Sequence, residues 1–457
     1  MDTQPKLTVS GYRGIWGESL TTTIAHDFAQ AFGLFITDTR PQPTILVARD
    51  GRESGKEITE HIISGLEKLG ITCIDGGILP TPTIIFAIRN HHFDGAIAIT
   101  ASHNPIEYNG LKFFTHKALY ANVDEIRAIQ EKYNTVHSQK TTSLDTSEKI
   151  VATKKESPFN FAKEHVDALL THIDVEAIRA RKFKVAVDMM NASACVVDPY
   201  LFEQLGITYT AINEIPDGKF THKPEPLKEN LTDIAQVVQQ GSFDIGFAQD
   251  PDADRLVIID ENGTVVSEEL TLSLGVENVL SQYPGSDVVI NMSTSQINCD
   301  IAQKYGGKCI RTKVGEAHVV EGILTHQAKI GGEGTGSSIY PTMNLARDSF
   351  VSLLLILELL AKRGQSTSGC VAELPYYVMK KDKVSVSTTL DDMYQRMKSH
   401  FTNATLNTLD GLRLDFADSS WIHLRPSNTE PIVRLYGEAK THERINELFT
   451  EARTILQ

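Results

Sequence analysis

Cysteine is scarce in this sequence, and its positions form no recognisable pattern. The chain has 457 residues and five cysteines, which are widely spaced and include no Cys-x-x-Cys pair. An odd, scattered set of this kind is not the framework of a disulfide-rich secreted domain, and it does not supply the paired thiolates of a zinc site. The cysteine pattern therefore predicts a reduced, cytoplasmic protein.

Long apolar runs and an excess of positive charge are also missing. The longest apolar run, residues 351–360, is interrupted by Ser352 and Glu358; it is too short to cross a bilayer and predicts a buried helix instead. The first twenty residues hold no continuous apolar segment of the kind found in a signal peptide. The formal net charge is -14, which leaves no basic excess to neutralise a nucleic-acid backbone. We expect neither a membrane nor a nucleic-acid partner.

The remaining composition is that of an ordinary globular protein, and strand-like and helix-like segments alternate along most of it. Hydrophobic residues make up 41% and charged residues 22%. Alternating strands and helices imply crossover connections and largely parallel sheets. From about residue 371 the pattern changes to strands around short helices, which indicates a separate α+β domain. The expected strands lie at 44–48, 71–74, 95–100, 183–187, 207–211, 244–248, 256–259, 287–290, 309–311, 376–380, 421–424 and 432–436.

The sequence therefore predicts an α/β protein with several domains. A chain of this length is too long for one compact domain. We expect three tandem α/β/α domains with mixed, largely parallel sheets, followed by a smaller C-terminal α+β domain. Residues 135–157, rich in Ser, Thr and Lys, are interpreted as a linker or exposed connection. The expected domains are residues 1–150, 151–255, 256–368 and 369–457.

The segment Thr-Ala-Ser-His-Asn-Pro at 100–105 places Ser102 directly after an expected strand. All four residues from Ser102 onward are ordinary turn formers, so a structural turn explains them equally well. The position favours a functional role, because open α/β sheets bind ligands at the carboxyl ends of their parallel strands. His103 is suited to orient the serine or carry a proton, and Lys112 adds a cation nearby.

The segment Asp-Pro-Asp-Ala-Asp-Arg at 250–255 is more specific. Alternate side chains of an extended chain point to one side, so Asp250, Asp252 and Asp254 are expected to converge on one hard cation. An EF-hand calcium loop is the sharpest competitor, since Glu261 occupies its twelfth position. The sixth position of such a loop must be glycine and is Arg255 here, and the flanking segments look like strands. The sequence therefore favours Mg²⁺ over Ca²⁺.

Two further loops carry groups that bind sugars and anions. Residues 331–338 combine flexible glycines with Glu333 and with hydroxyls that include Thr335, a suitable set for sugar hydroxyl groups. Residues 425–431 place a guanidinium beside two hydroxyls and an amide, a combination that binds phosphate monoesters. Either loop alone is also consistent with an ordinary turn. The phosphate-binding candidates are Arg425, Ser427, Asn428 and Thr429.

Taken in order, these four loops resemble the four signature loops of the α-D-phosphohexomutase superfamily. The resemblance covers essentially the whole chain and extends to Gly-Tyr-Arg-Gly at 11–14 and Arg-Asp-Gly-Arg at 49–52. It implies three α/β domains and a smaller fourth domain around a central cleft. It also implies an isomerase that interconverts hexose 6-phosphate and hexose 1-phosphate through a bisphosphorylated sugar. The partner would be a small sugar phosphate, and the protein would be a monomer or a homodimer.

The resemblance assigns roles to individual residues. Ser102 would be the phosphoserine that donates its phosphoryl group to the sugar. One Mg²⁺ would be held by Ser102 together with the three aspartates Asp250, Asp252 and Asp254. Three further residues, Arg13, His103 and Lys112, would flank the transferring group and assist proton transfer. Glu333, Thr335 and Arg255 would contact the sugar phosphate, and the four candidates of the C-terminal loop would hold its non-reacting phosphate. Hexose 1,6-bisphosphate would serve as intermediate and activator.

The sugar loop departs from the pattern of many bacterial phosphomannomutases and phosphoglucomutases. Where those enzymes carry Glu-Met-Ser-Gly-His, this chain has Glu-Gly-Thr-Gly-Ser, so that Ser337 stands at the position of the histidine. The form of the loop favours glucosamine phosphate as the substrate, with mannose and glucose phosphates as the alternative. A metal-dependent sugar phosphatase is disfavoured because hydrolysis needs no second phosphate site. A non-catalytic sugar-phosphate sensor is disfavoured because the serine and all three aspartates are present.

Overall fold

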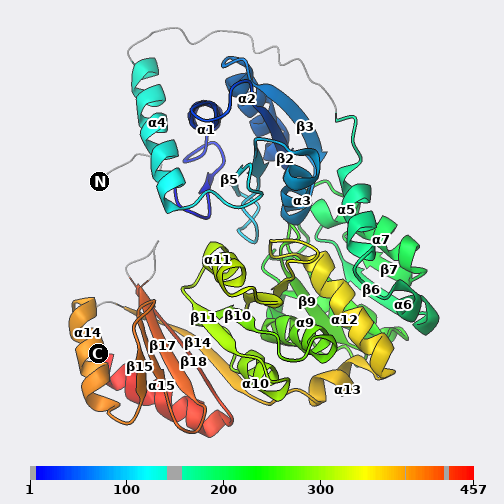
Figure 1. Cartoon of the computed structure of the whole chain (residues 1–457), viewed down its shortest axis with the longest axis vertical. Coiled ribbons are helices and arrows are strands. Elements are labelled where there is room, and N and C mark those ends of the chain that lie inside the picture. The colour runs from blue at the N-terminus through cyan, green and yellow to red at the C-terminus, as the bar shows by residue number, and fades with distance from the viewer. Residues whose placement is uncertain (1–6, 142–156, 386–387, 427–431, 457) are drawn as a thin grey trace. The chain divides into compact units, whose positions relative to one another are not determined.

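The computed structural model describes residues 7–141, 157–385, 388–426 and 432–456 (Figure 1). The chain divides into two compact units, one formed by Met1–Ser267 with Thr342–Thr367 and the other by Glu268–Pro341 with Ser368–Gln457. None of the helices in the described ranges has the length and apolar character that a membrane crossing requires.

The first unit begins with a five-stranded sheet in the order β1-β5-β4-β2-β3. Strands β3 and β4 run parallel to β2, whereas β5 runs antiparallel to both β4 and β1. The strands are β1 (Tyr12–Ile15), β2 (Thr44–Arg49), β3 (Thr72–Ile78), β4 (Gly95–Ile99) and β5 (Tyr108–Thr115). The helices are α1 (Thr22–Thr37), α2 (Ser54–Glu67), α3 (Thr81–His91) and α4 (Val123–Thr141).

Helices cover both faces of this sheet, which explains why its central strands are apolar throughout. Successive side chains of a strand point to opposite faces. Ile45 and Val47 of β2 accordingly pack with residues of α1, α2 and α4, whereas Leu46 and Ala48 pack with α3. The same layers can be followed in Figure 1. The first helix begins where the Thr21 side chain accepts a hydrogen bond from the backbone N–H of Ile24.

A second sheet in this unit has the order β7-β6-β8-β9. Strands β7 and β8 run parallel to β6, and β9 runs antiparallel to β8. The strands are β6 (Lys184–Asp188), β7 (Thr208–Ile212), β8 (Ile245–Gln249) and β9 (Leu256–Asp260). The helices are α5 (Phe161–Leu170), α6 (Val175–Arg181), α7 (Asp198–Leu205), α8 (Thr232–Gln240) and α12 (Ser349–Arg363), with 3₁₀ turns η1 (Ser193–Val196) and η2 (Lys228–Asn230).

The expectation that residues 256–259 open a third α/β unit is wrong. These residues form β9, which closes the second sheet by pairing with β8. The connection between the two strands is the short aspartate loop, and a crossover to a parallel strand needs a dozen residues or more. The chain must therefore turn back on itself at the aspartates. The other predicted domain limits, at residues 150 and 368, stay a prediction.

The apolar run at 351–360 is a buried helix, as the sequence predicts. It forms the body of α12, which packs against α6 and β9. Asp348 caps the start of the helix, because its carboxylate accepts the backbone N–H groups of Phe350 and Val351. Gly364 ends it in a left-handed conformation. The helix thus belongs to the first unit and not, as the sequence order suggested, with the residues of 268–341.

The second unit contains a four-stranded sheet in the order β11-β10-β12-β13. Its first three strands are parallel, and β13 runs antiparallel to β12. The arrangement repeats that of β7-β6-β8-β9 strand for strand. The elements are α9 (Glu268–Gln282), β10 (Val288–Asn291), α10 (Ile297–Lys304), β11 (Cys309–Thr312), α11 (Glu316–His326), β12 (Ile330–Glu333) and β13 (Ser337–Ile339), followed by α13 (Thr367–Ala372).

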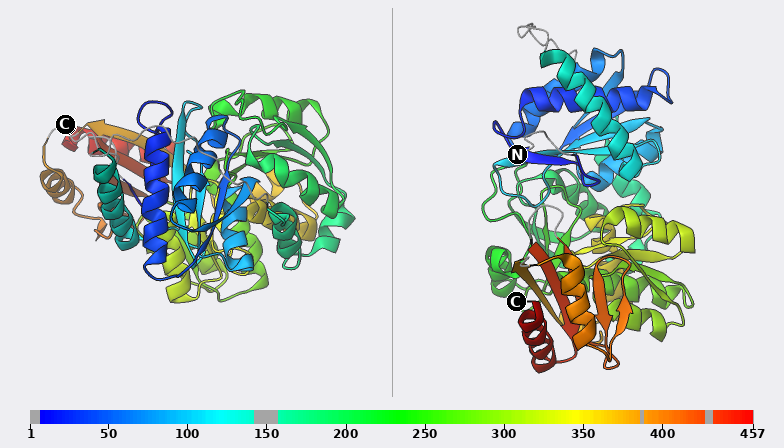
Figure 2. Two further views of the ribbon diagram at one scale, coloured as in Figure 1. Left: turned by 90° about the horizontal axis from the view of Figure 1, so that it is seen from above. Right: turned by 90° about the vertical axis from the view of Figure 1, so that its left-hand side faces the viewer.

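The C-terminal part of this unit is an antiparallel sheet with two helices, which confirms the predicted α+β domain. Its order is β14-β18-β17-β16-β15, and all neighbours are antiparallel. Apolar residues of α14 and α15 pack on the sheet in one core. The right-hand view of Figure 2 shows the two helices beside this sheet. The elements are β14 (Val378–Ser385), α14 (Leu390–His400), β15 (Thr405–Asn407), β16 (Leu412–Asp415), β17 (Trp421–Pro426), β18 (Ile432–Ala439) and α15 (His442–Leu456).

The linker predicted at 135–157 is only partly tested. Helix α4 continues to Thr141, so residues 135–141 are helical and the prediction is wrong there. Helix α4 continues past the predicted boundary because its apolar side chains, such as Tyr133 and Val136, are buried. Residues 142–156 lie outside the described part of the chain.

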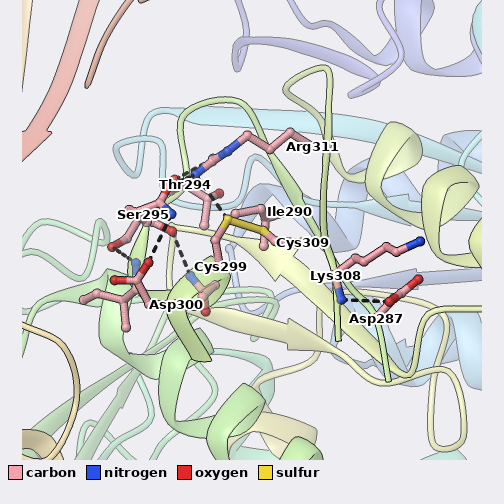
Figure 3. The surroundings of a disulfide bond; sticks show 12 residues. Asp287, Ile290, Thr294, Ser295, Cys299, Asp300, Lys308, Cys309 and Arg311 are labelled. Carbon is pink, nitrogen blue, oxygen red and sulfur yellow. Dashed lines mark hydrogen bonds between the residues drawn. A yellow bond between two sulfur atoms is a disulfide. The ribbon is translucent and has the colours of Figure 1, made fainter. Parts of the chain in front are cut away.

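A disulfide contradicts the expectation that every cysteine is reduced. Cys299 on α10 is bonded to Cys309 at the start of β11, ten residues later, with a Cα–Cα distance of 4.9 Å (Figure 3). Helix α10 packs against β11, and this tertiary contact brings together two cysteines whose spacing gives no sequence signal. The other cysteines, Cys73, Cys195 and Cys370, are not part of this disulfide.

Thiol counting tests the disulfide directly. Iodoacetamide added to the denatured, unreduced protein is expected to modify the three cysteines outside the disulfide, and all five after reduction. Cys299→Ser is the matched control, because all four remaining cysteines should then react without reduction. Reduction is also expected to lower the free energy of unfolding of the second unit by about 2.5 kcal/mol, the entropy of a short closed loop. Modification of all five cysteines without reductant would contradict the bond.

Candidate active site

Ser102 lies in a tight turn that follows β4 at the carboxyl end of the parallel strands. Its side chain is buried, and its backbone adopts a left-handed conformation with φ of 49°. A non-glycine residue in this region costs on the order of 1 kcal/mol and persists only where its surroundings fix it. Here the Ser102 backbone N–H donates to Thr100 Oγ1 at 2.8 Å, and the Asn104 N–H donates to the Ala101 carbonyl at 3.1 Å.

The three aspartates follow β8 at the equivalent place in the second sheet. Asp250, Asp252 and Asp254 are buried, and one carboxylate oxygen of each lies within 4.8 Å of the others. The convergence has a different cause from the expected strand alternation. The segment is a turn, with Ala253 left-handed at φ 51°, and Asp250 Oδ1 accepts the backbone N–H groups of Asp254 and Arg255, each at 3.1 Å.

The serine and the aspartates form one site within the first unit. Ser102 Oγ donates a hydrogen bond to Asp250 Oδ2 at 2.8 Å and lies 3.3 Å from His103 Nδ1. Lys112, which projects from β5, places its Nζ 2.5 Å from Asp252 Oδ2 and 3.5 Å from Asp254 Oδ2. Two loops that are about 150 residues apart in the chain thus supply a nucleophile, carboxylates and a cation to one buried cluster.

Burial and mutual repulsion determine the charges of this cluster. Burial, together with the charges of Asp252 and Asp254, raises the pKa of Asp250 well above its ordinary value. Burial alone would also raise the pKa of Asp252, but the Lys112 ammonium outweighs it and lowers that pKa. For Lys112 itself, burial opposes the charged form, yet Asp252 raises its pKa overall. The cluster therefore contains the Lys112–Asp252 ion pair beside the Asp250 carboxyl group, whose ionised form is disfavoured by burial and by its acidic neighbours.

The oxygen atoms of this cluster fit a hard divalent cation. Asp252 Oδ1 and Asp254 Oδ1 are buried and have no hydrogen-bond donor among the described residues. A buried carboxylate oxygen without a donor is costly unless a cation binds it. Mg²⁺ and Ca²⁺ both prefer such oxygen ligands. These three residues are the single group of three acidic, histidine or cysteine side chains with metal-binding spacing in the described part of the chain.

Two arginines and a histidine lie around the serine. Burial, followed by the nearby charges of Arg255 and Arg13, lowers the pKa of His103 to about 2. Its ring is therefore neutral at physiological pH. Arg13, on β1, donates from Nη1 to Asn104 Oδ1 at 2.7 Å, and burial lowers its pKa. Arg255 is held only loosely, with its nearest carboxylates, those of Glu225 and Asp254, at 3.9 Å.

No sequence signal pointed to two residues that contact the aspartates. Thr81, at the start of α3, donates from Oγ1 to Asp252 Oδ2 at 2.6 Å and from its backbone N–H to the Asp252 carbonyl at 3.0 Å. Arg347, just before α12, places Nη2 2.7 Å from Asp254 Oδ2. Both come from remote segments without a local motif, so only the tertiary structure reveals them.

In the second unit, the sugar loop is the hairpin turn between β12 and β13. Glu333 ends β12 and is buried, and its Oε1 accepts the Asn291 amide at 2.7 Å and the Gly315 N–H at 2.9 Å. The backbone N–H of Thr335 donates to the Glu333 carbonyl at 2.7 Å, which closes the turn. The carboxylate is thus fixed in position by groups from two other loops.

The phosphate loop is described only at its first residues. Arg425, near the end of β17, places Nε 3.3 Å from Asp410 Oδ2, and the same carboxylate oxygen accepts the Val314 N–H at 2.9 Å. The other predicted phosphate ligands, Ser427, Asn428 and Thr429, lie outside the described residues.

Known domains match this chain from end to end and in order. The alpha/beta/alpha domains I, II and III of phosphoglucomutase/phosphomannomutase match residues 5–140, 163–263 and 268–377. The C-terminal domain of the same family matches residues 379–455. The second of these matches includes β9, in agreement with its place in the second sheet.

Relatives and solved structures agree with this result. A Thermococcus kodakarensis protein named phosphoglucomutase/phosphomannomutase is 35% identical over 96% of this chain and 95% of its own length. A Pyrococcus abyssi protein named probable phosphoglucosamine mutase is 32% identical over 98% and 97%. The crystal structure of a phosphoglucomutase/phosphomannomutase family protein from Burkholderia thailandensis has a TM-score of 0.83 and 26% identity, covering 98% of this chain and 97% of its own.

A buried serine, a carboxylate cluster and these shared domains define an enzyme of the phosphohexomutase class, an isomerase. The chain belongs to the phosphoglucomutase/phosphomannomutase family.

Replacing one aspartate tests the metal site. Asp252→Asn is expected to lower the affinity for Mg²⁺, measured by titration calorimetry, by a factor of about 10 or more, because it removes a charged oxygen ligand. Asp233→Asn, at an exposed position on α8, is the matched control and should leave the affinity unchanged. Equal affinities of Asp252→Asn and the unsubstituted protein would contradict the assignment.

Proposed function

We propose that this enzyme interconverts hexose 6-phosphate and hexose 1-phosphate through a phosphoserine at Ser102. The observation that carries the proposal is the 2.8 Å hydrogen bond from Ser102 Oγ to Asp250 Oδ2 inside the buried carboxylate cluster. A serine oxygen in this position is next to the groups that compensate the charge of a phosphoryl group. It is buried as well, which keeps water away from a phosphate ester.

Two phosphoryl transfers complete the reaction. In the first, a free hydroxyl of the sugar monophosphate attacks the phosphorus atom of phosphorylated Ser102, and the serine oxygen leaves. The product is a hexose 1,6-bisphosphate and an unmodified serine. In the second, Ser102 Oγ attacks the other phosphate of that bisphosphate, which regenerates the phosphoserine and releases the isomeric monophosphate. The phosphoryl count is conserved, and added hexose 1,6-bisphosphate serves as the activator that phosphorylates an unmodified enzyme.

Residues around the serine supply protons and charge. His103, whose Nδ1 lies 3.3 Å from Ser102 Oγ, is placed to pass a proton between the attacking hydroxyl and the leaving oxygen. Lys112 and Arg13 carry positive charge beside the carboxylates, where charge develops on the transferring group. Arg255, which is only loosely paired, is placed to contact the substrate phosphate.

One Mg²⁺ per chain is the proposed cofactor. Asp250, Asp252 and Asp254 would hold it together with an oxygen of phosphorylated Ser102. When bound, it supplies the positive charge that offsets the phosphoryl oxygens during transfer. The two carboxylate oxygens without donors support this assignment.

The second unit is proposed to recognise the sugar phosphate. Glu333 and Thr335 would bind sugar hydroxyls, and Arg425 would bind the non-reacting phosphate together with Ser427, Asn428 and Thr429. The fixed position of the Glu333 carboxylate between Asn291 and Gly315 supports a role in recognition.

Glucosamine phosphate is the proposed substrate, and mannose or glucose phosphate is the alternative. The form of the sugar loop supports the first, since Ser337 replaces the histidine of many phosphomannomutases and phosphoglucomutases. The names of the relatives divide between the two activities, as phosphoglucosamine mutase and as phosphoglucomutase/phosphomannomutase. A monomeric or homodimeric state and a cytoplasmic location stay predictions. The disulfide weakens the cysteine argument for a reducing compartment.

Removing the serine hydroxyl tests the mechanism. Ser102→Ala is expected to lower mutase turnover by a factor of about 10³ or more, because no phosphoryl carrier remains. Intact mass after incubation with glucose 1,6-bisphosphate should show one added phosphoryl group on the unsubstituted enzyme and none on the variant. Ser242→Ala, at an exposed position, is the control for both measurements. Unchanged turnover of Ser102→Ala would contradict the phosphoserine mechanism.

A substrate panel tests the specificity. With Mg²⁺ and the matching bisphosphate present, kcat/KM is expected to be highest for glucosamine 6-phosphate and lower for mannose 1-phosphate and glucose 1-phosphate. Phosphate release is measured in the same reactions, because a phosphatase would release inorganic phosphate as fast as it consumes substrate. A higher kcat/KM for mannose or glucose phosphate would establish the alternative.

A further inference from the structure

A buried arginine binds the backbone of residues 102–108, the serine loop. Arg52 ends the Arg-Asp-Gly-Arg turn after β2, and only 1% of it is exposed. Its guanidinium donates to four carbonyl groups of a single segment, residues 102–108. Nη2 donates to Ser102 O and Asn104 O, both at 2.7 Å, and Nη1 donates to Pro105 O at 2.7 Å and Tyr108 O at 2.9 Å.

The remaining donor of the guanidinium anchors it to the sheet. Arg52 Nε donates to Asp50 Oδ2 at 3.1 Å, and the other oxygen of Asp50 accepts the Arg52 backbone N–H at 2.9 Å. The Asp50 backbone N–H in turn donates to Ile99 O, the last residue of β4, at 3.0 Å. All five N–H groups of the guanidinium are therefore used. The buried charge is compensated by one carboxylate and is fixed in a single orientation.

A loop from the second sheet closes over this arginine. The ring of Phe220 lies 4.9 Å from the guanidinium carbon, in the position of a cation–π contact. Gly218 permits the close packing, since its backbone is left-handed at φ 71° and a Cβ atom there would lie 2.3 Å from the Gly51 carbonyl oxygen. The guanidinium is thus enclosed between the serine loop and residues 218–220.

We propose that Arg52 is a positioning residue for phosphoryl transfer, and this inference rests on the proposed function. The serine loop has no regular strand or helix hydrogen bonds of its own between Ser102 and Pro105, and Ser102 is in a left-handed conformation. Four carbonyl groups gathered on one rigid fork fix that conformation. They hold Ser102 Oγ within hydrogen-bond distance of Asp250. Arg52 contacts no reacting atom and acts only through the loop.

The planar guanidinium of arginine is suited to binding four carbonyl groups at once. A lysine ammonium has three donors at a single point and cannot span four carbonyl groups, so a lysine would retain the charge and lose the geometry. A displacement of about 1 Å at a reacting atom costs a factor of about 100 in rate. Loss of Arg52 should therefore lower kcat much more than it changes the KM for the sugar phosphate, whose proposed ligands lie elsewhere.

The experiment compares Arg52→Lys and Arg52→Ala with the unsubstituted enzyme at saturating Mg²⁺. We expect kcat to fall by a factor of about 100 in both variants and KM to change less than about 3-fold. Millimolar guanidinium or methylguanidinium should restore part of the kcat of Arg52→Ala, because it refills the same fork, and should not restore Arg52→Lys. Arg89→Ala is the matched control, since Arg89 also donates from its guanidinium to a backbone carbonyl, that of Met343 at 3.0 Å, away from the loop.

Folding is followed in parallel by thermal unfolding. If Arg52→Ala does not fold, the inference is tested with Arg52→Lys and Asp50→Asn. Asp50→Asn keeps the shape of the side chain that binds Arg52 and should lower kcat by a smaller factor of about 3 to 10. Folded Arg52→Lys and Asp50→Asn variants with unchanged kcat would overturn the inference. A loss of kcat/KM that appears in KM alone, and that added guanidinium does not reverse, would also overturn it. Absence of mutase turnover in the unsubstituted enzyme would instead overturn the proposed function.

Discussion

Three carboxylates buried at one point are the constraint on which the rest of the site depends. Asp250, Asp252 and Asp254 are removed from water, and one carboxylate oxygen of each lies within 4.8 Å of the others. Like charges in a weakly polar interior repel strongly unless cations are close by. Two cations from other segments of the first unit lie close to these carboxylates: Lys112 comes from β5, and Arg347 lies just before α12. The site therefore assembles only when distant parts of the first unit have folded together.

The topology explains why the functional loops are where they are. The sheets β7-β6-β8-β9 and β11-β10-β12-β13 have the same strand order, and β3-β2-β4-β5 repeats it within the first sheet. In each, the third strand is followed by a short loop and an antiparallel fourth strand. The serine loop, the aspartate loop and the sugar loop are these three connections. Each of these connections is short and joins antiparallel strands, so it holds its polar groups in a fixed geometry at the carboxyl ends of parallel strands.

Much of this was readable from the sequence, because the relevant signals are local. Apolar runs with helices between them revealed most central strands, and the Ser102 and Asp250 loops stood out by their residue types. Strand pairing was harder. Residues 256–259 look the same whether they begin a new sheet or complete the previous one, and only the length of the preceding loop distinguishes the two.

Long-range contacts explain the remaining errors and omissions. The Cys299–Cys309 bond depends on the packing of α10 against β11, which no spacing rule predicts. Thr81 is an ordinary first residue of a helix until its contact with Asp252 is seen. Arg52 belonged to a recognised turn, yet its four bonds to the serine loop depend on how two neighbouring strands end. Sequence patterns thus indicated which loops matter, whereas the contacts that position them required the fold.

A single-turnover experiment distinguishes phosphoryl transfer through Ser102 from hydrolysis. Enzyme carrying a radiolabelled phosphoryl group on Ser102 is mixed with excess unlabelled glucosamine 6-phosphate and Mg²⁺, and the reaction is quenched at short times. If Ser102 carries the phosphoryl group, the label leaves the protein, appears first in hexose 1,6-bisphosphate and then divides between sugar monophosphate and enzyme. Transfer of the label to inorganic phosphate, or its retention on Ser102 while substrate is converted, would contradict the role of Ser102 as phosphoryl carrier.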